Sequence, residues 1–219
     1  MERLHYHFGA VLALILSSLA LGLAAPDTDG WRLAVVALQA ATLVAAVIAS
    51  RAHEWAIRMA VGASILLVAA AFGAVIGTDH FGSDSARVIS LLLVALAPPA
   101  IVTGVRKQFR AERRITAETM FGGLCLYLLI GLFFATAYGS FQDVFGAGDF
   151  FLGTAGDTSD FLYFSFATLT TVGYGDLVAA TDVGRSLAIT EALVGQIYLV
   201  TVVALIVGNL RAAPQTPNP

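Results

Sequence analysis

The chain has 219 residues, of which 58% are hydrophobic and 12% are charged, and its mean hydropathy is +0.83. This composition excludes an ordinary soluble domain and indicates a membrane protein. The formal net charge of −3 says little, because the placement of charge along a membrane protein matters more than its sum. Cys125 is the single cysteine, so an intrachain disulfide and a cysteine metal cluster are excluded.

Six apolar runs have about the 20 residues that a helix needs to cross the hydrocarbon. They cover residues 8–25, 33–49, 55–77, 86–105, 120–138 and 184–209. The sequence therefore predicts an all-α membrane protein with six transmembrane helices. The first run also fits a cleaved signal peptide, because Arg3 precedes it and Pro26 follows it. Five further spans follow, so its removal would leave the rest of the topology unchanged.

The basic residues fall mainly on one side of these spans. With a cytoplasmic N-terminus, nine lie inside and Arg32, Arg87 and Arg185 lie outside, which fits the positive-inside rule. The nine inner residues are Arg3, Arg51, Arg58, Arg106, Lys107, Arg110, Arg113, Arg114 and Arg211. We therefore expect a multi-pass protein of the cell membrane, plasma or inner, with both termini in the cytoplasm.

Residues 1–105, which hold the first four runs, are expected to form a four-helix transmembrane domain rich in alanine and other small residues. The fourth run carries no basic residue between positions 88 and 105. It contains Pro98 and Pro99, which remove backbone donors, and we expect a kink or a break there.

A basic linker at residues 106–117 follows the fourth run. Arg106, Arg110 and Arg114 are spaced four apart, and Phe109 is placed to dip into the interface, which predicts a segment lying on the inner leaflet. One interpretation is anionic-lipid binding or gating control, and the other is a solvated basic segment that only fixes topology. The candidate lipid-binding residues are Arg106, Lys107, Arg110, Arg113 and Arg114.

The most specific pattern is Thr-Thr-Val-Gly-Tyr-Gly-Asp at residues 170–176. Residues that tolerate unusual backbone angles alternate here, and they can turn successive carbonyl oxygens toward one axis, where they replace the water around a cation. The preceding apolar stretch, 161–169, is too short to span and predicts a re-entrant helix capped by Ser159 or Asp160. The structural alternative is a glycine-rich turn between two apolar helices.

Residues 170–176 resemble the selectivity filter of potassium channels at every position. The resemblance implies a homotetrameric pore in which carbonyls of Thr171, Val172, Gly173 and Tyr174 bind K⁺ and Gly175 completes the filter. It places a pore domain at residues 118–211, with the re-entrant helix and the filter loop between the fifth and sixth helices. Filter support is implied for Thr170, Asp176, Tyr163 and Phe164. Residues 212–219 are expected to form a disordered tail.

Two departures from the family limit what the resemblance implies. The first four runs resemble the sensor domain of six-helix channels in number and spacing, but the fourth lacks the sensor's basic residues, so voltage gating by that helix is not expected. Many bacterial channels carry a glutamate that binds the filter aspartate at the position of Ala167. Asp176 therefore needs another partner, for which Tyr163 is a candidate.

The last run contains two polar residues, Glu191 and Gln196, that would not face lipid. We expect Glu191 to be buried and hydrogen-bonded to a hydroxyl of the re-entrant helix, either Ser165 or Thr168. The resemblance implies that Gly195 is a hinge, although a packing glycine is also common in membrane helices. It further places Gln196 in the cavity below the filter, with an apolar gate at Leu199, Val203 and Val207.

The sequence thus predicts a potassium-selective channel that conducts K⁺ passively, with K⁺ as permeant ion and no cofactor. No catalytic residues, and no surface for nucleic acid, stand out, so an enzyme is not expected. One alternative is a channel gated by pH, lipid or tension, for which the candidate titrating groups are His5, His7, His53 and His80. The other is a non-conducting accessory membrane subunit, or a part of a potassium uptake transporter.

Overall fold

The computed structural model describes residues 8–24, 29–50, 52–76, 83–112, 116–144 and 149–211. Seven helices lie in these residues, and each of the six apolar runs coincides with one of them. The helices are α1 (Phe8–Ala24), α2 (Asp29–Ala49), α3 (Glu54–Ile76), α4 (Ser83–Glu112), α5 (Ala117–Val144), α6 (Thr158–Leu169) and α7 (Asp182–Arg211).

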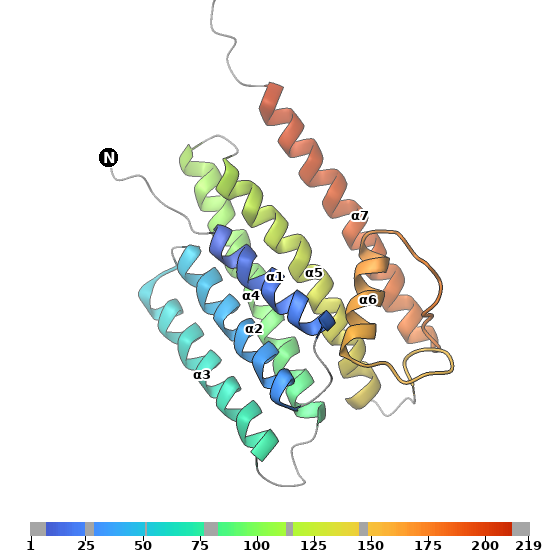
Figure 1. The fold of residues 1–219 in the computed structure, drawn as a ribbon. Coiled ribbons are helices and arrows are strands. Elements are labelled where there is room, and N and C mark those ends of the chain that lie inside the picture. Colours follow the sequence, from blue (N-terminus) through green and yellow to red (C-terminus); the bar gives the residue numbers. More distant parts are fainter. Residues whose placement is uncertain are drawn as a thin grey trace, which may run out of the picture.

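The first four helices form a bundle, with α5 beside α4 and with α6 and α7 on the other side of α5 (Figure 1). Within the described part of the chain, α3 packs against α2 and α4 alone and lies at the periphery. Its large apolar side chains, among them Trp55, Leu66 and Phe72, are exposed. The outer face of α3 is therefore suited to lipid.

Helix α1 joins the two halves of the chain, because it packs against α2 in the bundle and against α5 and α6 in the C-terminal half. The contact with α6 is close: a Cβ atom on Gly22 would lie 2.6 Å from Leu162 Cδ1. At the other end of α1, the Phe8 amide donates a 2.8 Å hydrogen bond to Glu118 Oε2 of α5. Through α1, the bundle thus packs against the C-terminal half of its own chain.

Helix α4 continues through Pro98 and Pro99 to Glu112, so of the expected kink or break, the break is wrong. The prolines remove two backbone donors, but Leu93, Ala97 and Ile101 are buried on one face that extends to both sides of them. Tertiary packing of this face against α2 and α5 outweighs the lost hydrogen bonds. Residues 106–112 are accordingly the last turns of α4, so no helix end separates them from the fourth run, and their interfacial position stays a prediction.

Three helical stretches of the described residues are long and apolar enough to cross a membrane, namely Glu54–Gly73, Val88–Arg110 and Ala117–Gln142. Phe8–Ala24 and Leu33–Ala49 are also apolar but shorter. These stretches support a membrane protein. The count of six spans stays a prediction.

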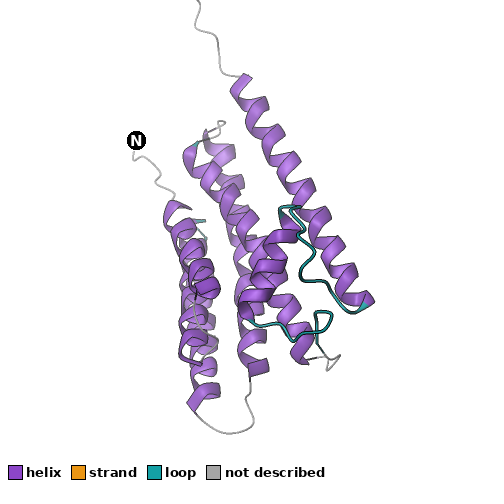
Figure 2. Cartoon of the chain, turned by 45° about the vertical axis from the view of Figure 1, so that its right-hand side comes forward, coloured by secondary structure: helices purple, strands orange, loops and turns teal. Residues whose placement is uncertain are grey.

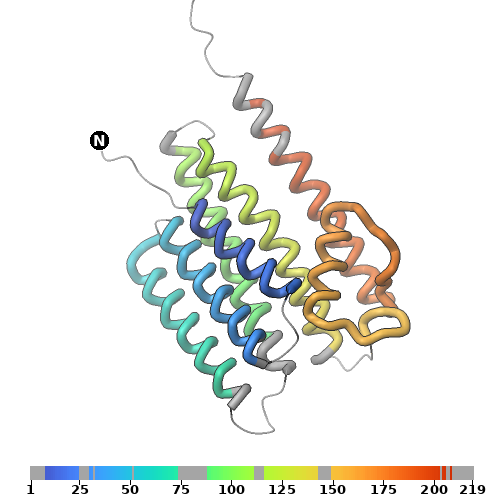
Figure 3. The backbone as a smooth tube through the Cα atoms, in the orientation of Figure 1, coloured from blue at the N-terminus to red at the C-terminus, as the bar shows by residue number. Residues whose placement is uncertain are grey.

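Two loops flank α6 and lie side by side (Figure 3; teal in Figure 2). The loop before α6 and the loop after it are joined by the hydrogen bonds Leu152 N to Val178 O and Ala180 N to Phe150 O, each 2.9 Å. Both loops are therefore fixed relative to α6, which is what positions the segment at residues 170–176.

Candidate functional site

Helix α6 begins with a reciprocal cap. Asp157 Oδ1 accepts the Asp160 amide at 2.9 Å, and Asp160 Oδ2 accepts the Asp157 amide at 3.2 Å, which forms a capping box. The cap is thus Asp157, and the expected cap at Ser159 or Asp160 is wrong. The 12 residues of α6 extend about 18 Å, less than the roughly 30 Å of the hydrocarbon, so α6 cannot cross a membrane.

An aromatic cluster packs behind α6. Phe164 is buried and has its ring centroid 5.3 Å from Tyr138, 5.3 Å from Phe151 and 6.0 Å from Phe150. Phe161 lies on the same side, 5.2 Å from Phe151. Because rings at these spacings are in contact, one face of α6 is held by α5 and by the preceding loop. Of the two aromatic residues predicted to support the filter, Phe164 lies in this cluster.

The backbone φ angle alternates in sign along residues 170–176. The φ angle is positive at Thr171 (60°), Gly173 (55°) and Gly175 (79°), and at neither of the two residues between them. Glycine adopts such angles freely, but for a β-branched residue such as Thr171 they cost on the order of 1–3 kcal/mol. Strain of this kind is typical of functional sites, and the alternation is the pattern expected for carbonyl oxygens turned toward one axis.

The first part of this segment is held by the end of α6. The Ala167 carbonyl oxygen accepts two amides, from Val172 at 2.9 Å and from Gly173 at 3.1 Å. The Tyr127 hydroxyl of α5 donates to the Leu169 carbonyl at 3.2 Å. Carbonyl groups that the end of α6 would leave unpaired therefore have partners.

The last residue of the segment is held by a side chain of α6. The Tyr163 hydroxyl donates to Asp176 Oδ2 at 2.8 Å, and the Tyr163 ring stacks on Tyr174 with a centroid distance of 6.1 Å and an interplanar angle of 7°. The hydrogen bond from Tyr163 lowers the pKa of Asp176, and the same bond raises the pKa of Tyr163 to about 12. Tyr163, the suggested replacement for the missing glutamate, is the partner of Asp176.

Glu191 of α7 is fully buried where α5, α6 and α7 meet. Its carboxyl group accepts the Tyr138 hydroxyl of α5 at 2.5 Å and also the Ser165 hydroxyl of α6. Ser165 additionally lies 2.7 Å from the Gly131 carbonyl oxygen. Of the two expected partners, Ser165 and Thr168, the structure selects Ser165. Tyr138 was not foreseen.

Residues 122–212 match a family model described as an ion channel. The match begins within α5, includes α6 and all of residues 170–176, and extends past the last residue of α7, so it contains the geometry above. No curated protein and no solved structure matches the chain significantly. The family match supports an ion-channel domain in the C-terminal half.

In the ion-channel domain, Gly195 is a site of close packing. A Cβ atom there would lie 2.6 Å from Leu169 Cδ1 and 2.9 Å from the Leu169 carbonyl oxygen, and α7 is helical through this position. Gln196 and Leu199 are exposed on α7 in the single chain. Val203 and Val207 lie on α7, but their side chains are outside the described set.

A residue that sequence reasoning missed is Gln142, near the end of α5. Its Oε1 accepts the amides of Phe150 at 3.1 Å and Gly156 at 3.2 Å, and its Nε2 donates to the Gly156 carbonyl at 3.3 Å. Gln142 therefore joins α5 to two positions of the loop before α6, Phe150 and Gly156. In the sequence, Gln142 is only a single amide residue after an apolar run, and this pattern does not predict its hydrogen bonds.

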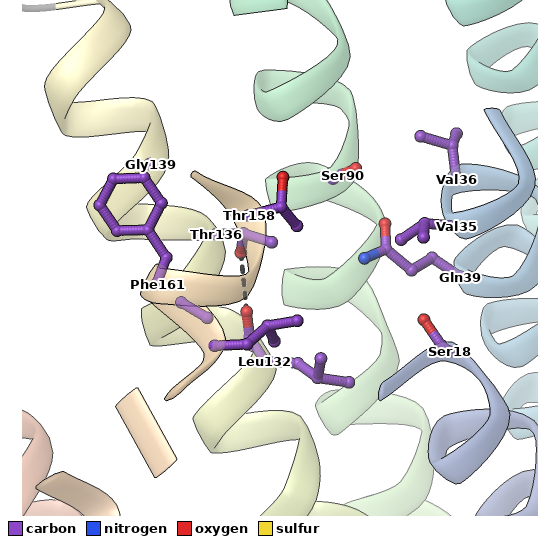
Figure 4. A pocket seen from close by; sticks show the side chains of 12 residues that line it. Ser18, Val35, Val36, Gln39, Ser90, Leu132, Thr136, Gly139, Thr158 and Phe161 are labelled. Carbon is purple, nitrogen blue, oxygen red and sulfur yellow. Dashed lines mark hydrogen bonds between the residues drawn. The ribbon is translucent and has the colours of Figure 1, made fainter. Parts of the chain in front are cut away.

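A cavity of about 80 Å³ lies between the bundle and the ion-channel domain (Figure 4). Ser18 of α1 and Gln39 of α2 line it from the bundle, and Thr136 and Thr158 line it from the other side. Ser18 Oγ and Gln39 Oε1 are buried and have no hydrogen-bond partner among the described residues. The contact between the two halves is thus partly polar.

The predicted lipid-binding residues are only partly described. Arg106, Lys107 and Arg110 are exposed on the last turns of α4, and Lys107 Nζ lies 3.5 Å from the Ser50 carbonyl oxygen. Arg113 and Arg114 lie outside the described residues. Arg106 and Arg110 both line a groove beside the ion-channel domain.

Proposed function

We propose that this chain is a subunit of a homotetrameric potassium channel that conducts K⁺ passively across the cell membrane. The observation that carries the proposal is the alternation of positive φ angles at Thr171, Gly173 and Gly175. It occurs within Thr-Val-Gly-Tyr-Gly, directly after a short helix, in the region that matches an ion-channel model. The proposal includes α6 as the re-entrant pore helix and residues 170–176 as the filter.

The filter chemistry rests on backbone carbonyl groups. Carbonyls of Thr171, Val172, Gly173 and Tyr174 would replace the hydration shell of K⁺ when four copies surround one axis. In the single chain Val172 is 52% exposed and Tyr174 is 72% exposed, so both side chains are free to contact neighbouring copies. The C-terminal end of α6 carries partial negative charge, which favours a cation beneath the filter.

Exposed apolar residues of α7 offer a second surface to neighbouring copies. Ile189, Leu193, Ile197 and Val200 are all exposed in the single chain, and they recur at intervals of three and four residues. Such a stripe fits a helix that contacts other subunits of a bundle. It supports the homotetramer.

The proposed channel is not gated by a charged fourth helix. Within the span Val88–Arg110 the basic residues are Arg106, Lys107 and Arg110, all in its last turns. Each charge would have to move through the field to confer voltage dependence, and none lies in the middle of the helix. The proposed topology places both termini in the cytoplasm, with K⁺ as permeant ion and no resident cofactor.

The test is the reversal potential of the purified protein in planar bilayers under a potassium–sodium gradient, recorded over a range of voltages. Reversal near the potassium equilibrium value, with open probability nearly independent of voltage, would support the proposal. Gly173→Asp and Tyr174→Ala should abolish selective current while membrane insertion persists, since the apolar helices set insertion. Potassium selectivity retained in either variant would contradict the filter assignment.

Absence of current from well-folded protein would favour the alternative of a non-conducting accessory subunit. Reversal at a potential set by both cations would contradict potassium selectivity. Gating by pH has less support, because His53 is exposed on the bundle, far along the chain from the filter, while His5, His7 and His80 lie outside the described residues.

A further inference from the structure

A groove of about 360 Å³ separates the last turns of α4 from the C-terminal half of α7. Helices α4 and α7 are not packed against each other in the described part of the chain, and α5 forms the floor between them. The walls are mainly apolar, and their apolar side chains are Val105, Phe109, Met120, Leu126, Val202 and Leu205. The volume lies within the range of about 300–1,000 Å³ that is usual for ligand clefts.

In the floor of the groove, a hydrogen bond and a ring contact hold α7 to α5. The Tyr198 hydroxyl of α7 donates to the Gly123 carbonyl of α5, and the rings of Tyr198 and Tyr127 stack with centroids 5.8 Å apart. Helix α7 extends past the end of α5 (Figure 1). The groove lies beside this C-terminal half of α7, where Val202 and Leu205 line it.

The rim of the groove is basic. Arg106 and Arg110 are four residues apart on one face of α4, and neither forms an ion pair with the described acidic residues. Thr119, in the first turns of α5, also lines the groove, so the partial positive charge of that helix terminus lies nearby. The acid of the same turn, Glu118, accepts the Phe8 amide instead.

We propose that this groove binds one acyl chain of an anionic phospholipid, with the lipid phosphate held by Arg106 and Arg110. Apolar walls beneath two arginines that pair with none of the described acidic residues match an apolar chain attached to an anionic headgroup. The positive-inside rule places this end of α4 at the inner leaflet. A bound acyl chain fills the space between α4 and α7 and so connects the bundle to the C-terminal half of α7. Lipid binding does not depend on the proposed conduction.

The first experiment measures lipid retention by native mass spectrometry of the intact protein, released from nanodiscs of phosphatidylglycerol or of phosphatidylcholine. Phosphatidylglycerol should be retained preferentially. The double variant Arg106→Gln/Arg110→Gln should weaken its retention about thirty-fold, which corresponds to about 2 kcal/mol for two phosphate contacts. The matched control is Arg58→Gln, because Arg58 is an exposed basic residue of α3 that pairs with Glu54 and does not line the groove.

A second variant tests the acyl-chain part of the site. Met120→Trp narrows the apolar floor while it keeps both arginines, and it should also reduce retention. Equal retention of the two lipids, or unchanged phosphatidylglycerol retention in both variants, would overturn the proposal. So would a disulfide formed between the chains of Met120→Cys/Leu205→Cys protein, because a neighbouring subunit would then cover the groove.

Measurement of K⁺ flux from vesicles with and without phosphatidylglycerol tests whether the bound lipid connects α4 to α7. Phosphatidylglycerol should change the flux of the unaltered protein and of Arg58→Gln, but not that of Arg106→Gln/Arg110→Gln. A change of equal size in all three proteins would contradict the connection between α4 and α7. Flux absent in every membrane, with lipid retention intact, would contradict the proposed function and leave the lipid site supported.

Discussion

The hydroxyl group of Tyr163 donates a 2.8 Å hydrogen bond to the carboxylate of Asp176, and its ring lies parallel to that of Tyr174. One side chain of α6 thereby contacts two residues at the far end of the candidate filter.

Replacing Tyr163 by phenylalanine keeps the stacked ring and removes the donor to Asp176. We expect shorter channel openings with an unchanged reversal potential, because the backbone carbonyls and not this side chain would select the ion. Single-channel recording measures both quantities. Asp176→Asn, which keeps an acceptor for Tyr163, should have the smaller effect, and equal open times in all three proteins would contradict a supporting role for the bond.

The hydrogen bond between Tyr163 and Asp176 should make a constant contribution over a wide range of pH. The pKa of Asp176 is lowered, so its contribution is present above the ordinary aspartate value of about 3.9 and is lost as pH falls through the lowered value. The pKa of Tyr163 is raised to about 12, so its contribution is lost as pH rises through about 12. K⁺ flux should therefore be constant between about pH 5 and 9, and a steep change there would assign the titration to another group.

Substitution of Glu191 should distinguish hydrogen bonding from charge. Glutamine offers Tyr138 an oxygen and Ser165 an amide donor, so Glu191→Gln should be close to the unaltered protein in thermal stability. Alanine leaves the buried Tyr138 hydroxyl without its acceptor, which costs about 1–3 kcal/mol, and adds a cavity. Thermal unfolding in detergent measures the difference. Equal losses for the two variants would show that the charge, and not the hydrogen bonds, is required.

Gly195→Ala should destabilise the ion-channel domain. The new methyl group would approach the Leu169 backbone oxygen to 2.9 Å, and a backbone atom at the end of α6 cannot turn aside. Overpacking of this kind costs about 1–3 kcal/mol, and flux should fall because α6 ends at the filter. Gly62→Ala on α3 is the control, since nothing lies within 4 Å of its Cβ position. A variant of Gly195 as stable and active as that control would contradict the close packing.

Gln142→Leu should loosen the loop before α6. The amides of Phe150 and Gly156 would both lose their acceptor, at about 1 kcal/mol for each bond. Gln142→Glu keeps an acceptor for both amides and loses the donor to Gly156, so its loss should be smaller. Thermal unfolding ranks the two variants, and the opposite order would contradict the acceptor role.

Six of the helices described could be predicted because each contains one apolar run of nearly the length of a membrane span, and α6 could be predicted as the short apolar stretch before residues 170–176. Details that depend on packing could not. Asp157, Ser159 and Asp160 are all good capping residues, and the choice of Asp157 depends on two reciprocal backbone contacts. Pro98 and Pro99 favour a break, but the buried face of α4 continues past them, because tertiary packing overrides local propensity.

In the candidate site, the residues themselves were easier to predict than their partners. A carboxyl group inside a membrane helix must have a hydrogen-bond partner, which predicted the burial of Glu191 and its contact with Ser165. Its contact with Tyr138 depends on how α5 is rotated, and periodicity gives no such detail. Tyr127 and Gln142 were missed for the same reason, since both contact residues on other elements.

The position of α1 has a consequence for biosynthesis. Two of its neighbours, α5 and α6, are synthesised some 90 residues or more after it, which takes roughly 5–20 s at ~5–20 residues per second. During that interval α1 can pair with α2 but exposes Gly22 and the rest of the face that later packs against α6. A ribosome stalled before α5 should therefore hold a bundle that membrane chaperones still recognise as unfinished.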